Sequence, residues 1–93
     1  MGIKPDAHDQ IHAFCKVCGY DPGYPPWGLD GDQPTNDICN CCGVEWGYED
    51  TAPSSIINFR ERWIAEGAPW DDPEIPDDGL TTGERLANIR VSI

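Results

Sequence analysis

The clearest hydrophobic pattern in this 93-residue chain lies just after its midpoint. Apolar side chains recur there with helical spacing, so we predict the main helix over residues 54–67. Ser54 or Ser55 can cap its start, and Gly67 stands where glycine commonly ends a helix. At 100° per residue, one arc of about 160° holds the apolar side chains; they are Ile56, Ile57, Phe59, Trp63 and Ile64. This stripe predicts a helix that packs against the rest of the protein.

Strand patterns precede this helix. We predict one strand over residues 13–17 and a second, half-buried strand in which Val44, Trp46 and Tyr48 alternate with polar residues or glycine. A turn-rich loop with several prolines lies between them. Trp27 and Leu29 are the apolar side chains that we expect to anchor this loop.

The two ends of the chain and the segment after the main helix have other patterns. Residues 1–12 carry few apolar side chains, so we expect a flexible N-terminus. Residues 68–80 are acidic and rich in proline, which predicts an extended connector. Thr81 and Glu84 have the spacing of a capping box, which predicts a short last helix over residues 81–90.

Composition limits the chain to one small domain, which we place at residues 13–93. Hydrophobic residues make up 39% of the chain, and it contains ten glycines and nine prolines. A chain of this size buries only about two thirds of its unfolded surface. We therefore expect an additional crosslink to support the core.

The charge excludes one class of partner. Seventeen acidic residues against six Lys and Arg give a formal charge of −11, which opposes contact with the phosphates of nucleic acid. No apolar stretch approaches the roughly 20 residues that span a bilayer, and no signal peptide is recognisable. We therefore expect a cytoplasmic protein without membrane contact.

Five cysteines supply the strongest chemical signal. Cys15 and Cys18 form one Cys-x2-Cys-Gly unit, and Cys39 and Cys42 form another after a spacer of 20 residues. We call residues 15–20 the first knuckle and residues 39–44 the second knuckle. This pattern is typical of zinc sites, in which four thiolates close a tetrahedral shell without an open position. We predict a structural Zn²⁺ bound by these four residues, whereas buried thiols or a redox pair are the alternative.

Two other residues leave alternatives open. Cys41 is left over between the predicted ligands, as a buried free thiol or as an alternative ligand or redox-sensitive thiol. Arg60 falls near the middle of the apolar helix stripe. It either snorkels past its apolar neighbours or pairs with buried acids, and a position near the thiolates would offset part of their charge.

The order of these features resembles a widespread group of small bacterial Cys-rich proteins. That group has a Cys-x2-Cys-Gly-Tyr knuckle, a proline-rich loop and a second knuckle of the form Cys-Pro-Cys-Cys. The matching segments span most of the chain; they are residues 15–20, 38–50, 59–64, 67–70 and 84–89. Asn40 stands here in place of the proline, and every cysteine is retained. The resemblance implies metal binding and this architecture, but no activity.

A shorter resemblance is to rubredoxins, through residues 18–23 and 42–44. It implies iron and electron transfer as the alternative to zinc. Rubredoxins have a longer spacer between the knuckles and end soon after the second, so we favour zinc. The predicted fold is therefore a small α+β domain. Zinc-ribbon or rubredoxin-like, metal-stapled β-hairpins at residues 13–50 precede the main helix and a short C-terminal helix.

We predict a non-enzymatic, zinc-stapled acidic module that binds a basic protein, with an inhibitor of the immunity or anti-defence type as one form. No catalytic triad or phosphate loop can be assembled from the sequence. The predicted partner-binding residues lie in the acidic connector and include one aromatic anchor; they are Trp70, Asp71, Asp72, Glu74, Asp77 and Asp78. The alternative is a solvated linker whose Trp70 packs back onto the main helix.

Overall fold

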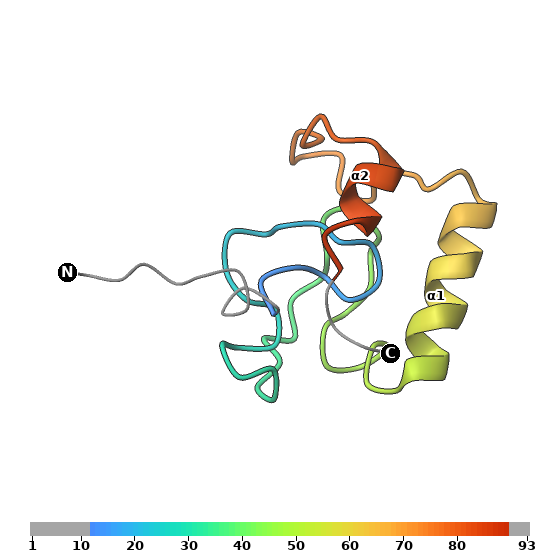
Figure 1. Ribbon diagram of the computed structural model, residues 1–93. Coiled ribbons are helices and arrows are strands. Elements are labelled where there is room, and N and C mark those ends of the chain that lie inside the picture. Colours follow the sequence, from blue (N-terminus) through green and yellow to red (C-terminus); the bar gives the residue numbers. More distant parts are fainter. Residues whose placement is uncertain (1–11, 90–93) are drawn as a thin grey trace.

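The computed structural model describes residues 12–89, so the predicted flexible N-terminus lies almost wholly outside the described residues. The described part contains two helices, α1 (Pro53–Ala65) and α2 (Thr82–Leu86), and the rest is built from turns and loops. In Figure 1, α1 stands along one side of the loop-built part and α2 lies above it. Neither helix is long and apolar enough to cross a membrane.

The start of α1 corrects the predicted cap. Ala52 is the N-cap with an extended backbone, and no side chain caps the first turn. Pro53 takes the first helical position, where its fixed φ fits and its missing N–H is not needed. The serines after it therefore lie inside the helix.

The end of α1 confirms the predicted role of Gly67. This glycine has a φ of 96°, and its N–H donates to the carbonyl of Ile64 at 2.9 Å. The N–H of Ala68 donates to the carbonyl of Trp63 at 2.8 Å. These two bonds form a Schellman motif, which satisfies carbonyls that the last turn would otherwise leave unpaired.

The buried face of α1 is narrower than the predicted stripe. Ile56 and Trp63 are buried and Phe59 is half-buried against the core. Ile57 and Ile64 are 39% and 44% exposed, so their predicted burial is wrong. The contact of the helix with the core is therefore limited mainly to Ile56, Phe59 and Trp63.

The predicted β-hairpins are reduced to a single antiparallel bridge between Ile38 and Glu45 in residues 12–89. Residues 13–17 form bends and turns, so the predicted first strand is wrong. Their hydrogen bonds are local, because the backbone of each knuckle turns back on itself to aim two sulfurs at one point.

The second predicted strand is also wrong. Val44 and Trp46 are buried. The carbonyl of Glu45, which lies between them, accepts hydrogen bonds from the N–H groups of Tyr48 and Glu49 at 3.1 and 3.3 Å. The chain therefore turns, and Tyr48 is 72% exposed. Val44 and Trp46 point to the core as predicted, but from a turn.

The core is centred on the two knuckles. Nine of its eleven buried hydrophobic residues come from positions 15–46, and α1 contributes the other two. They are Cys15, Val17, Cys18, Tyr20, Cys39, Cys41, Cys42, Val44, Trp46, Ile56 and Trp63. Since five of the eleven are cysteines, the bonding of their sulfurs decides how stable the core is.

Helix α2 has the predicted capping box. The hydroxyl of Thr81 accepts the N–H of Glu84 at 3.1 Å, and the carboxylate of Glu84 accepts the N–H of Thr81 at 2.8 Å. The helix ends at Leu86, so it is shorter than the predicted range of 81–90.

Only one of the two predicted anchors of the proline-rich loop packs against the core. Trp27 is half-buried and packs against the core as predicted, and its indole N–H donates to the carboxylate of Asp50 at 2.7 Å. Leu29 is 78% exposed, so its predicted anchoring is wrong. Of the two predicted anchors, only Trp27 therefore holds the loop against the core.

Candidate metal centre

Four buried cysteine sulfurs cluster where a metal ion could bind. The Sγ atoms of Cys15, Cys18, Cys39 and Cys42 all lie within 4.8 Å of one another. Cys15 and Cys42 are 3.8 Å apart, and Cys18 and Cys39 are 3.7 Å apart. A tetrahedron with metal–sulfur bonds of about 2.3 Å has edges of about 3.8 Å, so this donor set fits such an ion. The distances also exclude disulfides, whose S–S bond is about 2.05 Å.

The two knuckles have the same local hydrogen bonds. In the first knuckle, the N–H of Cys15 donates to the carbonyl of Tyr20, and the N–H of Gly19 donates to the carbonyl of Cys15, both at 2.9 Å. In the second knuckle, the N–H of Cys39 donates to the carbonyl of Val44 at 2.8 Å, and the N–H of Gly43 donates to the carbonyl of Cys39 at 2.9 Å. The site is therefore assembled from two copies of one turn, each of which supplies two sulfurs.

A glycine ends each of these turns for two reasons. Gly19 and Gly43 have φ values of 84° and 83°, which side chains disfavour. A Cβ on Gly19 would lie 1.7 Å from the carbonyl oxygen of Arg85, and one on Gly43 would lie 2.8 Å from the carboxylate of Asp71. The missing side chains thus let α2 and the acidic segment lie directly against the two knuckles.

The thiols cannot all ionise without a cation. Burial and hydrogen bonds with neighbouring cysteines raise the pKa of Cys18, and burial and the bond with Cys15 raise the pKa of Cys42. Burial also acts to raise the pKa of Cys15, but hydrogen bonds from the other three cluster thiols and Trp46 hold it well below its usual range. One thiolate is thus favoured at the expense of the others, and a bound cation would supply the charge that four thiolates require.

Cationic side chains lie next to the first knuckle. The guanidinium of Arg60 donates to the carbonyls of Val17 and Lys16 at 2.7 and 2.8 Å. The sequence predicted that Arg60 either snorkels past its apolar neighbours or pairs with buried acids. Its partners are backbone carbonyls instead, so neither prediction describes this contact. The contact ties α1 to the turn that carries Cys15 and Cys18, and it places a positive charge beside the thiol cluster.

Lys16 is held on the same turn. Its ammonium lies 3.9 Å from the ring centroid of Trp27. Burial lowers the pKa of this amine, and the charges of Asp50 and Cys15 act in the opposite direction. The side chain therefore adds a second, partly desolvated cation near the cluster.

The second knuckle is supported by backbone donors. The N–H of Asp71 donates to the carbonyls of Asn40 and Cys41, both at 3.1 Å, and the N–H of Asp72 donates to Asn40 at 3.0 Å. In each knuckle, the two residues between the cysteines therefore have hydrogen-bonded carbonyls. The donor is the guanidinium of Arg60 in the first knuckle, and the donors are the backbone amides of Asp71 and Asp72 in the second.

Cys41 occupies the place in the second knuckle that Val17 occupies in the first. The two side chains are 1% and 0% exposed, and the Cys41 sulfur is outside the group of four. Its position therefore agrees with the expectation of a buried free thiol.

Two buried residues near the centre were missed by the sequence analysis. The fully buried carboxylate of Asp50 accepts the N–H groups of Trp27 and Gly47, both at 2.7 Å. Arg85 is 4% exposed and binds Asp77 and Asp78. Neither shows a sequence signal, because a single charged residue in a polar segment looks solvated until its partners are known.

The predicted partner-binding residues come together, but their aromatic member faces inward. Trp70 is half-buried, packs edge-on against Tyr20 at 5.4 Å and lies 5.3 Å from the guanidinium of Arg85. Its indole donates to the carbonyls of Asp72 and Ile75 at 2.9 and 2.8 Å. It therefore packs against Tyr20 of the first knuckle and Arg85 of α2.

The carboxylates of this segment differ in their contacts. Asp77 and Asp78 bind Arg85 at 3.0 and 2.7 Å, whereas Asp71 and Glu74 are exposed. Asp72 accepts the N–H of Glu74 at 2.9 Å. Contacts within the chain thus hold parts of the acidic segment, residues 71–78, in place.

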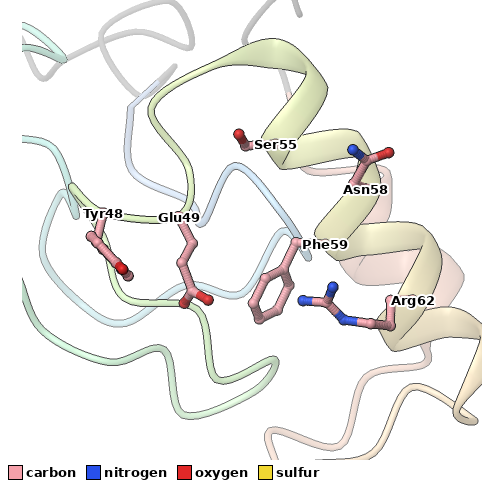
Figure 2. A pocket seen from close by; sticks show the side chains of 6 residues that line it. All are labelled: Tyr48, Glu49, Ser55, Asn58, Phe59 and Arg62. Atoms are coloured by element: carbon pink, nitrogen blue, oxygen red, sulfur yellow. The ribbon is translucent and has the colours of Figure 1, made fainter.

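An open hollow of about 460 Å³ lies between α1 and the turn that precedes it. It is lined by Tyr48, Glu49, Ser55, Asn58, Phe59 and Arg62. Figure 2 shows the guanidinium of Arg62 beside the ring of Phe59, which it approaches to 5.2 Å from the centroid. None of the four clustered cysteines lines it, so it is separate from the candidate metal centre.

No protein-family model and no solved structure match the chain. Two proteins of Bacillus subtilis (strain 168) do. "Uncharacterized protein YozI" is 32% identical over an alignment that covers 77% of this chain and 73% of that protein. "Uncharacterized protein YoaQ" is 30% identical, with 77% and 74% covered. At this identity and coverage, the chain belongs to the same protein family as YozI and YoaQ.

Proposed function

We propose that this protein binds one zinc ion through Cys15, Cys18, Cys39 and Cys42, and that the ion has a structural role. The observation that carries this proposal is a compact group of four buried sulfurs at tetrahedral spacing. Four thiolates complete the shell of zinc, so no position is left for a substrate. Zinc supplies the positive charge that holds the four thiolates together. The protein is accordingly not expected to be an enzyme.

The second candidate is electron transfer through iron, which the same four sulfurs also suit. The rubredoxin-like residues 18–23 favour it. Metal analysis of protein purified from cells grown with both metals separates the candidates. One zinc per chain in a colourless protein supports our proposal. A red protein with one iron per chain would contradict it and favour electron transfer.

The ligand set is tested with matched cysteine variants. Cys39→Ser removes one of the four clustered sulfurs and should abolish stoichiometric metal binding. Cys41→Ala removes the sulfur outside the cluster, so this variant should retain one metal per chain. Retention of metal by Cys39→Ser, or its loss from Cys41→Ala, would show that the ligand assignment is wrong.

We further propose that the acidic segment, residues 71–78, binds a basic protein. The chain carries a formal charge of −11, and contacts of Trp70 with Tyr20 and of Arg85 with Asp77 and Asp78 hold parts of the acidic segment in place. An acidic segment that is already held in place attracts cationic proteins, and little further ordering is needed when it binds them. Inhibition of a nucleic-acid-binding protein, by covering its basic site, is the form of this function that the charge favours.

Charge-matched variants test this interaction. One variant carries Asn or Gln at Asp71, Asp72, Glu74 and Asp77, and keeps Asp78 to preserve its bond with Arg85. The control carries the same number of neutral substitutions at exposed acids elsewhere; these are Asp30, Asp32, Glu61 and Glu66. We expect only the first variant to lose a basic partner that the wild type captures from its native host. Equal capture and equal salt dependence for both would contradict the assignment.

A further inference from the structure

One side chain holds both carbonyls that lie between Cys15 and Cys18. The Nε atom of Arg60 donates to the carbonyl of Val17 at 2.7 Å, and one of its terminal nitrogens donates to the carbonyl of Lys16 at 2.8 Å. The arginine is half-buried, so water competes with these bonds only in part. The guanidinium therefore forms a rigid fork from α1 to two neighbouring carbonyls of the first knuckle.

This fork completes the fixation of the backbone between the two cysteines. Three peptide units connect Cys15 with Cys18, and each unit carries one carbonyl. The carbonyl of Cys15 accepts the N–H of Gly19 at 2.9 Å, and Arg60 binds the other two. Because a peptide unit is planar and rigid, a bond to its carbonyl restrains the whole unit. Arg60 consequently limits the directions in which the two sulfurs of this knuckle can point.

The second knuckle has the same arrangement with different donors. The N–H of Gly43 donates to the carbonyl of Cys39 at 2.9 Å. The backbone N–H groups of Asp71 and Asp72 bind the next two carbonyls at 3.0 to 3.1 Å. Each knuckle thus receives donors from a distant segment for the two carbonyls between its cysteines. The second knuckle receives them from the backbone, whereas the first receives them from a single side chain.

We propose that Arg60 is a positioning residue of the metal centre, which holds the first knuckle in the shape that lets Cys15 and Cys18 bind the metal together. This inference rests on the proposed metal binding by the four cysteines. Residues that support metal ligands generally orient them, and here the support acts on the peptide units that join two ligands. The positive charge of Arg60 also favours thiolates nearby, so a test must separate charge from orientation.

The direct test uses metal-loaded wild-type protein that is labelled with ¹³C and ¹⁵N. A hydrogen bond transmits a small scalar coupling from the donor nitrogen to the carbonyl carbon. We expect this coupling between Nε of Arg60 and the carbonyl carbon of Val17. Its absence, in a spectrum that shows the coupling from Gly19 to Cys15, would overturn the inference. If the wild type binds no metal, the proposed metal binding itself fails, so the two failures are distinguishable.

Matched variants measure the consequence for metal binding. Arg60→Met keeps an unbranched stem and removes both donors and the charge. Arg62→Met removes the same charge from the same helix, and the contact of Arg62 is with the ring of Phe59. We expect Arg60→Met to weaken zinc binding about 10–100-fold, the usual loss for a partner of a metal ligand. Arg62→Met should keep wild-type affinity. Wild-type affinity in Arg60→Met would overturn the inference.

A conservative variant separates charge from orientation. Arg60→Lys keeps a positive charge, but its ammonium lacks the planar fork that reaches two carbonyls at once. We expect Arg60→Lys to recover only part of the affinity that Arg60→Met loses. Full recovery would assign the effect to charge alone and would overturn the positioning role.

A spectrum separates positioning from the docking of α1. Ile56→Val weakens the packing of this helix at a residue that is 5% exposed, and it leaves the fork of Arg60 in place. With Co²⁺ in the site, the visible absorption bands report how the four sulfurs are arranged. Arg60→Met should alter these bands, whereas Ile56→Val should leave them unchanged. Weaker binding by Arg60→Met with unchanged bands would mean that Arg60 only docks α1, and would overturn the inference.

Discussion

At the scale of single residues, two glycines with similar backbones make a controlled comparison. Gly19 and Gly67 have φ values of 84° and 96°, so both favour glycine. A Cβ on Gly19 would overlap the carbonyl of Arg85, whereas a Cβ on Gly67 would have nothing within 4 Å. We expect Gly67→Ala to cost about 1–2 kcal/mol, the usual penalty of a left-handed residue.

Gly19→Ala should cost clearly more, because α2 must also move away from the first knuckle. Chemical denaturation of the metal-loaded variants measures both losses. Equal losses at the two positions would show that the close approach of α2 to Gly19 contributes no stability.

Arg85 allows a second comparison between single residues. Its guanidinium makes three hydrogen bonds with Asp78, of 2.7 to 3.1 Å, and one of 3.0 Å with the more exposed Asp77. We expect Asp78→Asn to lower the free energy of unfolding by about 1.5–3 kcal/mol at neutral pH, the range for bonds to charged groups. Asp77→Asn should cost less than about 1 kcal/mol, because its side chain is 55% exposed.

The contribution of Asp78 also has a defined pH dependence. Hydrogen bonds from Arg85 lower the pKa of this carboxyl below its usual value. Its contribution is therefore complete above the unfolded pKa of about 3.9 and is lost as the pH falls through the lower, folded pKa. The difference in stability between the wild type and Asp78→Asn should shrink in acid. A difference that grows on acidification would contradict this assignment.

At the scale of elements, the docking of α1 depends on one tryptophan. Trp63 is 4% exposed, and its indole donates to the carbonyl of Pro69 at 2.9 Å. We expect Trp63→Ala to lower the free energy of unfolding by about 3–5 kcal/mol, the range for a buried large aromatic side chain. Ile64→Ala is the matched control, because Ile64 is 44% exposed on the same helix. A similar loss for both variants in chemical denaturation would mean that α1 packs through another face.

The elements were predicted from the sequence to different extents. The existence of α1 and its end at Gly67 follow from local spacing and from the backbone freedom of glycine. Its start could not be predicted in this way, because Pro53, Ser54 and Ser55 can each stand at the start of a helix. In the structure, Pro53 takes the first helical position. The strands could not be predicted correctly, because an alternation such as Val44 and Trp46 shows only which side chains face inward. A tight turn at Glu45 satisfies the same pattern.

At the scale of the whole molecule, the four-cysteine cluster was predictable and its surroundings were not. Sequence spacing places Cys15 and Cys42 in one site, because each Cys-x2-Cys-Gly unit forms an independent turn. The contacts of Arg60, Trp46 and Arg85 depend on how distant segments meet, for example α1 with the carbonyls of the first knuckle. Tertiary contacts of this kind leave no periodic signal in the chain.

These contacts join α1, the acidic segment and the residues after α2 to the two knuckles. Arg60 connects α1 to the first knuckle, the amides of Asp71 and Asp72 connect the acidic segment to the second, and Asn88 donates to the carbonyl of Gly19 at 3.2 Å. Few other elements are available to hold the fold, since the only β pairing in residues 12–89 is one bridge. The order of the knuckles should therefore control the order of the whole domain.

Removal of the metal by a chelator should consequently unfold the protein in one step. Without the cation, the clustered thiolates must take up protons, and the knuckles lose the bonds that hold their sulfurs together. Helix α1 has only 13 residues, and helices of that length are marginal in water without tertiary support. We expect the helical circular dichroism and the tryptophan fluorescence to change together as metal is withdrawn, and to return on adding zinc. Retention of the helical signal in metal-free protein would show that α1 is stable without the centre, and that the metal does not organise the fold.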